Sequence, residues 1–329
     1  MWYISFHGSK KKINNIHVYD DSGKPHSKLK LLQKGKSSPK LKELRAIQIV
    51  EDVLYVVNGY KKYSQVLTYT ANKKGNYKFT EVIASRKNID GIFHPYDVTF
   101  DKNGNCYVSN QDSNVVIGLK GPNQPMHVAS FLKQNYSQSA NFFDGTIVAS
   151  FVGKLPKIKH SPPPNVPLPQ GLAVSLTTEN GKEKVAHSVR GILYHNDFLF
   201  VSDEPANTVK VYAMPSGQLH AYIKGDNLLA PVQLLEHKNV LYIGSSGNGS
   251  VVTVDLPTEF PSGKIAPTTF IDNEIPSISG MAFDGDGNFY AAERKDNSIL
   301  KFPANGGSKE VFISGLKDNP EFILYVPND

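Results

Sequence analysis

Five copies of one strand pattern, tight turns rich in Asn and Gly, and a sixth copy split between the two ends of the chain predict an all-β fold, a six-bladed β-propeller. Each copy reads as an apolar strand, a turn, a strand led by an aromatic residue, a polar turn and a third alternating strand. The copies recur every 40 to 50 residues or so, about the length of a four-stranded antiparallel blade. The 329 residues are therefore expected to form one domain, residues 1–329.

The complete copies occupy residues 43–75, 94–121, 190–217, 230–257 and 278–306. Turns such as KNGN and GDGN place Asn and Gly where tight hairpins need a positive φ. A fourth strand usually closes the unit, as in YKFTEVIAS, LHAYIKG and KEVFISG. Each blade is therefore expected to contain four antiparallel strands.

The split copy predicts how the ring closes. The chain begins with MWYISFHG, which reads as a second strand without a first, and NPEFILYV near its end reads as a first strand without a second. Pairing the C-terminal strand into the N-terminal blade would cover two otherwise open sheet edges.

One spacing is irregular. The gap between Asn110 and Asp203 is about twice the usual one, which predicts an insertion at about 133–189. A degenerate seventh blade is the alternative, but residues 133–144 offer no innermost strand. The proline-rich residues 160–170 in this insertion are a candidate lid or docking loop.

Composition limits the class of protein. Cys106 is the only cysteine, so no disulfide can form within the chain. No apolar run is long enough to cross a membrane and no signal peptide is recognisable, so a soluble, cytoplasmic monomer is expected; a leader removed earlier would leave no trace. Residues 1–45 carry eleven Lys or Arg against three acids, but without interleaved aromatic residues, and nucleic-acid binding is not expected.

The residues resemble the NHL-repeat propellers and, more loosely, the YVTN propellers. RGILYHNDFLFVSDEPANTVKVYAMPSG is similar to the NHL pattern, and CYVSNQDSNVV is similar to the YVTN form. The resemblance covers nearly the whole chain apart from 133–189. It implies the architecture, but NHL-like propellers include both binding scaffolds and enzymes.

Equivalent positions in the copies are expected to face equivalent places around the ring axis. The residues that end the second strands are His7, Asn58, Asn110, Asp203, Ser245 and Glu293. Such side chains commonly hydrogen-bond their own turns. The alternative is a Ca²⁺ or Mg²⁺ site formed by Asn58, Asn110, Asp203 and Glu293. A zinc site of His7, His94 and His187 is a lesser alternative, because these histidines share no column.

A second column lies near the start of the innermost strands. Its members are Arg45, Tyr96, Arg190, Val232, Ser279 and Glu321, with His94 and His187 close by. The ligand-binding candidates are Arg45, Tyr96, His94, His187, Arg190 and Glu321, which should surround the mouth of a central channel. Arg45 and Arg190 are expected near Glu293 and Asp203, either as ion pairs between blades or as grips on an anion.

Two functions follow. The first is a binding or scaffolding module that engages a protein, peptide, glycan or small molecule at the channel mouth. The alternative is a metal-assisted hydrolase or lyase, because gluconolactonase-like and strictosidine-synthase-like propellers use a Glu, an Asn and an Asp around the axis. Amidating lyases place zinc ligands where this sequence has PYD and VRG. The common nucleophile-elbow, phosphate-loop and zinc motifs are absent from the sequence.

Overall fold

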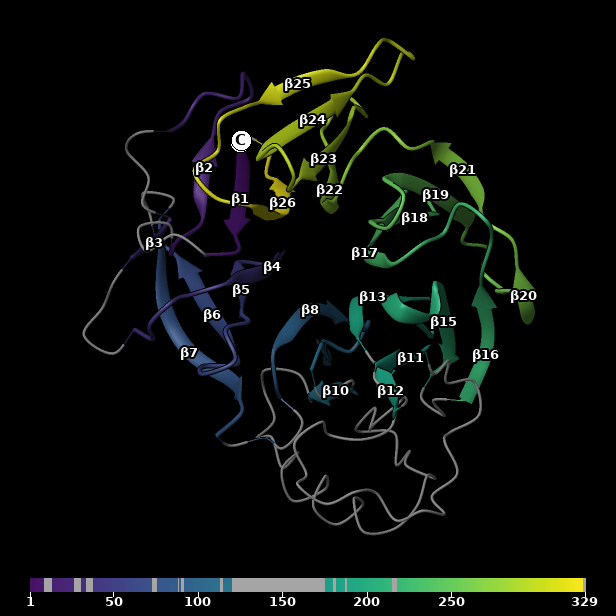
Figure 1. Ribbon diagram of the computed structural model, residues 1–329. Coiled ribbons are helices and arrows are strands. Elements are labelled where there is room, and N and C mark those ends of the chain that lie inside the picture. The colour runs from purple at the N-terminus through teal and green to yellow at the C-terminus, as the bar shows by residue number, and fades with distance from the viewer. Residues whose placement is uncertain are drawn as a thin grey trace.

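The computed structural model is an all-β ring of six blades (Figure 1). It describes residues 1–8, 14–26, 31–33, 38–72, 76–87, 89, 92–112, 115–119, 175–179, 182–186, 188–214 and 218–327. The innermost strands of the six blades are β26, β4, β8, β13, β17 and β22, which surround the axis in this order. The predicted six-bladed propeller is confirmed.

The first three blades have these strands. Blade 1 contains β26 (Pro320–Tyr325), β1 (Trp2–Phe6) and β2 (His17–Tyr19); blade 2 contains β4 (Leu44–Val50), β5 (Val53–Asn58), β6 (Gln65–Ala71) and β7 (Tyr77–Ser85); blade 3 contains β8 (Pro95–Phe100), β9 (Cys106–Asn110) and β10 (Val115–Leu119). The predicted fourth strand YKFTEVIAS is β7.

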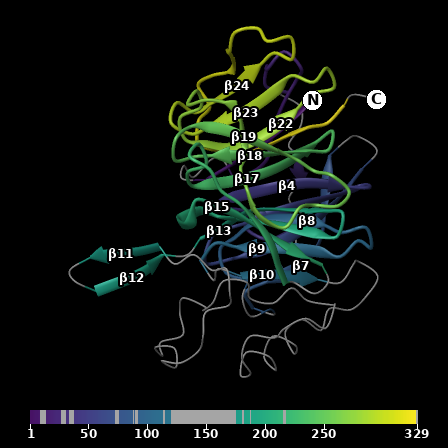
Figure 2. The same cartoon turned by 90° about the vertical axis from the view of Figure 1, so that its right-hand side faces the viewer.

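The other three blades complete the ring. Blade 4 contains β13 (Val189–His195), β14 (Phe198–Asp203), β15 (Thr208–Ala213) and β16 (Gln218–Ile223); blade 5 contains β17 (Pro231–His237), β18 (Val240–Ser245), β19 (Ser250–Asp255) and β21 (Thr268–Ile271); blade 6 contains β22 (Ile278–Phe283), β23 (Phe289–Glu293), β24 (Ser298–Phe302) and β25 (Glu310–Ile313). In the side view, blade 5 lies between blades 4 and 6 (Figure 2).

Short elements lie outside this four-strand plan. β3 (Leu32–Gln33) adds a parallel strand to the outer edge of blade 2, and β20 (Gly263–Ile265) does the same for blade 4. A 3₁₀ turn, η1 (Glu204–Ala206), follows β14. No helix among the described residues is long and apolar enough to cross a membrane.

Little of the predicted insertion can be compared with the structure. Within it, β11 (Ser175–Glu179) and β12 (Lys182–Ala186) form a separate antiparallel hairpin, and blade 4 already begins at Val189. The predicted lid at 160–170 lies outside the described residues.

The ring closes as the sequence predicted. β26 pairs antiparallel with β1, with Tyr3 opposite Leu324. Trp2, the only tryptophan, is buried at this closure, where its ring centroid lies 4.1 Å from that of Tyr290 in blade 6 and 4.9 Å from that of Tyr325. Apolar side chains of neighbouring blades thus form the core between the sheets.

Neighbouring innermost strands are joined by polar side chains and by close backbone contacts at glycine. Asp97 accepts a hydrogen bond from the backbone N–H of Ile192 (3.1 Å), and the Gln233 side chain accepts one from Met281 N–H, so each polar side chain bridges to the next blade. At Gly191 and Gly280 the next blade's backbone comes so close that a Cβ would lie 2.5 and 2.6 Å from a carbonyl oxygen. Glycine is therefore required at these two positions.

Candidate functional site

The six residues of the predicted second column occupy the same structural position. Each is the second residue of its innermost strand, and each lies where the pairing register with the second strand shifts. Such a β-bulge re-aims the side chain out of the alternating pattern of the strand. The repeat thus brings residues that are distant in sequence to one end of the ring axis.

A repeated backbone hydrogen bond defines two further columns beside the bulges. The N–H after each second strand donates to the carbonyl two residues before the bulge residue, in the pairs His7 to Asn319, Gly59 to Glu43, Gln111 to His94, Glu204 to Ser188, Ser246 to Ala230 and Arg294 to Ser277. Four of these carbonyl residues have a left-handed backbone, Glu43, His94, Ala230 and Ser277. Because different residue types share this conformation, it belongs to the blade entry rather than to one function.

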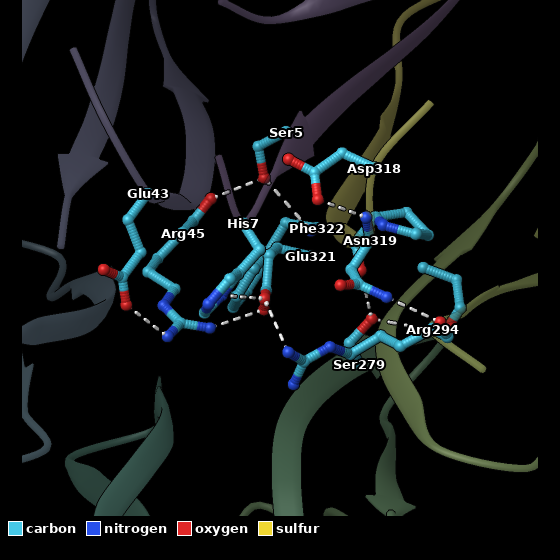
Figure 3. A network of polar contacts seen from close by, with 12 residues as sticks. Ser5, His7, Glu43, Arg45, Ser279, Arg294, Asp318, Asn319, Glu321 and Phe322 are labelled. Atoms are coloured by element: carbon cyan, nitrogen blue, oxygen red, sulfur yellow. Dashed lines mark hydrogen bonds and ion pairs between the residues drawn. The ribbon is translucent and has the colours of Figure 1, made fainter. Parts of the chain in front are cut away.

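Glu321 is the centre of the charged residues at this end of the ring. Its side chain is fully buried (0% exposed) and contacts Arg45 Nη1 at 2.7 Å, His7 Nδ1 at 2.9 Å and, at 3.4 Å, Arg294 Nη2 (Figure 3). Although burial favours the neutral acid, the Arg45 charge and its neighbours lower the pKa of Glu321 to about 2. Glu321 is therefore ionised at neutral pH and holds blades 6, 1 and 2 together.

A chain of ion pairs continues from Arg45 toward blade 3. Arg45 Nη2 contacts Glu43 at 2.8 Å, and the same carboxylate lies 2.7 Å from His94 Nε2. His94 Nδ1 lies 3.0 Å from Asp112, which also pairs with Lys61 at 2.7 Å. Burial lowers the pKa of His94, but its bonds to Asp112 and Glu43 outweigh burial and raise it. The His94 imidazole is a bridge between blades 2 and 3.

Tyr96 lies between two arginines. The guanidinium carbon of Arg45 is 5.4 Å from the Tyr96 ring centroid, and that of Arg190 is 5.1 Å away. Arg190 also directs Nε and Nη2 to one oxygen of Glu204, at 2.8 and 2.7 Å. Burial, and then the charge of Glu321, raises the pKa of Tyr96 to about 12, so the phenol stays protonated. We call His7, Glu43, Arg45, Tyr96, Arg190, Glu204, Arg294 and Glu321 the axial cluster.

The four metal-ligand candidates form hydrogen bonds or an ion pair with residues of their own blades. Asn58 accepts from Lys42 N–H, Asn110 accepts from Phe93 N–H, and Glu293 accepts from the N–H groups of Lys295 and Asp296. Asp203 lies 2.6 Å from the buried ammonium of Lys210. No group of three or more His, Cys, Asp or Glu arranged to hold a metal occurs within the described part of the chain. The Ca²⁺ or Mg²⁺ site stays a prediction.

The structure brings four of the six ligand-binding candidates together. Arg45, Tyr96, Arg190 and Glu321 belong to the axial cluster, whereas His94 is in the bridge beside it, and His187 lies outside the described residues. The arginines pair with Glu321, Glu43 and Glu204 rather than with the expected Glu293 and Asp203. The reason is that Glu293 and Asp203 interact within their own blades: Glu293 accepts a hydrogen bond from Lys295 N–H, and Asp203 pairs with Lys210.

Three members of the axial cluster follow directly after second strands. The pairing register places Phe6, not His7, opposite Pro320, so His7 is equivalent to Glu204 and Arg294 rather than to Asn58. The sequence comparison missed this column because it stopped at the last strand residue. The rarity of arginine could have pointed to Arg294, since only four arginines occur in the chain.

No family model matches the chain, and no curated protein matches it. Several solved structures, in contrast, are similar to it. The chain is similar to a streptogramin B lyase structure (12% identity over 97% of this chain and 86% of that chain, TM-score 0.55) and to a chain of a nidogen/laminin complex (11%, 98% and 96%, TM-score 0.57). A putative 6-phosphogluconolactonase from Bacteroides fragilis is similar at 12% identity, 97% and 83% coverage and a TM-score of 0.54. At these identities the likeness shows the fold alone, a β-propeller.

Proposed function

We propose that this protein is a propeller binding module whose ligand site is the axial cluster. The supporting observation is that side chains from four blades gather around Glu321 and around Tyr96, which belongs to a fifth blade. Ionised groups lose hydration when they are gathered in this way, and apolar residues could join blades at lower cost. Ligand sites are commonly places where a few polar groups converge, and the candidate ligands of the axial cluster are peptides, glycans and small organic molecules.

Exposure distinguishes the members of the cluster. Arg45 has a structural role, because its side chain is 4% exposed and both terminal nitrogens contact carboxylates. Arg190, His7 and Arg294 have side chains that are 16%, 31% and 34% exposed. These three residues can contact a ligand without disrupting the buried pairs of Arg45.

The test compares two variants in a ligand screen. Arg190→Ala is expected to keep the melting temperature of the parent and to lose binding to any peptide, glycan or small molecule that the parent binds. Lys102→Ala is the matched control, since Lys102 pairs with Asp197 across blades 3 and 4 and is 70% exposed. Exposed pairs of this kind contribute about 0 to 1 kcal/mol.

One outcome would contradict the proposal. If Arg190→Ala lowers the melting temperature strongly and leaves the ligand profile unchanged, Arg190 is a strut between Tyr96 and Glu204, and the ligand site lies elsewhere. The metal-assisted hydrolase or lyase is tested separately by elemental analysis of the purified protein. Stoichiometric divalent metal, abolished by Asp203→Asn and Glu293→Gln, would favour the enzyme.

A further inference from the structure

The arginines of this chain are concentrated at the axis. Only four of the 36 Lys and Arg residues are arginine, and three of these four belong to the axial cluster. They come from blades 2, 4 and 6, and the charges of all three act on Tyr96. The fourth, Arg86, donates to the Lys61 carbonyl outside the cluster. Elsewhere the chain uses lysine, so arginine marks positions where its particular geometry matters.

Each carboxylate of the cluster already has a cationic partner. Glu321 receives Arg45 on one oxygen and both His7 and Arg294 on the other. Glu204 receives two nitrogens of Arg190. Within the described residues, Arg294 therefore has no carboxylate of its own.

Donors, in contrast, are left over. The Arg294 side chain makes only the 3.4 Å contact to Glu321, and its buried Nε has no acceptor in the described part of the chain. Arg190 uses Nε and Nη2, and no described residue accepts from its Nη1. Both arginine side chains are partly exposed.

We propose that Arg190 and Arg294 form an anion site that accepts a carboxylate or phosphate group of the ligand. A planar guanidinium donates two parallel hydrogen bonds to either group, which an ammonium cannot do. This inference rests on the proposed binding function and names its ligand class. The buried Glu321 positions Arg294, whose Nη2 lies 3.4 Å from its carboxylate.

The four arginines allow a direct test. In the full chain labelled with ¹⁵N, the Nε–Hε groups give at most four signals, which arginine variants assign. Inorganic phosphate, titrated at constant ionic strength, is expected to shift the signals of Arg190 and Arg294 in a saturable way and to leave Arg86 unchanged. If the signals do not move, or if all move together without saturation, the anion site does not exist.

Matched variants separate recognition from charge. Arg294→Lys keeps the charge and is expected to weaken phosphate binding at least tenfold, as is Arg190→Lys, with melting temperatures within about 2 °C of the parent. Arg86→Lys is the control and should bind like the parent. Unchanged affinity in both axial variants would overturn the inference.

A second titration with acetate identifies the source of the anion. Saturable shifts with phosphate alone indicate a phosphate ligand, shifts with acetate alone a carboxylate ligand, and shifts with both the shared chemistry. If uncharged glycans or peptides perturb the axial cluster while neither anion does, the anion inference fails and the binding function stands. If no compound perturbs it, both fail.

Discussion

Asp97 is expected to make the stability of this protein depend on pH. It is fully surrounded between blades 3 and 4, where it accepts hydrogen bonds from Val98 N–H and Ile192 N–H. Burial raises the pKa of Asp97 from 3.8 to about 7, because these two hydrogen bonds only partly offset the loss of water. The unfolded chain therefore ionises at lower pH than the folded chain.

The sign and size follow from this difference. A raised folded-state pKa means that stability is full below about pH 4 and is lost as the pH rises through 7. Between pH 5 and 7 the loss is about 1.4 kcal/mol per pH unit, or about 3 kcal/mol in all. Asp97→Asn cannot ionise, so its unfolding free energy relative to the parent should rise by about 3 kcal/mol from pH 5 to pH 8.

Urea unfolding at pH 5, 6, 7 and 8, followed by the fluorescence of Trp2, measures this. The chain offers its own control, because Gln233 occupies the equivalent bulge position in blade 5 and bridges to Met281 with a neutral amide. Gln233→Glu should introduce the same pH dependence there. Parallel stability profiles for the parent and Asp97→Asn across this range would refute the reasoning.

Four further outcomes are expected. Deleting 319–329 removes β26 and should lower the melting temperature sharply; an unchanged melt would remove the closure model. Gly280→Ala should cost about 2 kcal/mol or more in chemical unfolding, whereas Gly285→Ala should cost little, because its Cβ would meet only the Tyr325 ring, at 3.9 Å. Glu321→Gln should remove stability that the parent loses between pH 4.5 and 2, seen as a flatter acid-unfolding profile. Mobility shifts near physiological salt should detect no binding to DNA or RNA, and tight binding lost on neutralising Lys10 to Lys12 would contradict this.

The sequence predicted the blades because turn chemistry and strand alternation are local. KNGN and GDGN fix hairpins wherever they occur, and Asp101 and Asp284 indeed bond the N–H groups of these turns. The split blade followed from strand order alone. Arg45, Tyr96, Arg190 and Glu321 could also be found, since one repeat position defines one place on the ring.

The rest of the site depends on side-chain direction, which periodicity does not fix. Adjacent residues at the end of a strand point to different sides, so two neighbouring polar positions can reach different places. Glu293 turns into its own loop while the next residue, Arg294, reaches Glu321. The residue of blade 1 that is equivalent to Asn58 is the apolar Phe6, so a polar pattern selects its neighbour His7 and places it one position off.

The pairing of β26 with β1 also governs how the ring can form. Leu324 and Tyr3 are neighbours across a sheet although nearly the whole chain separates them. Contacts of such long sequence separation form late, because the entropy of closing the intervening chain is lost before the contact stabilises anything. During synthesis, blade 1 remains an open edge next to the indole of Trp2 until residues 320–325 have emerged. Folding is therefore expected to end with a slow step at this blade, and partly folded chains should associate through it.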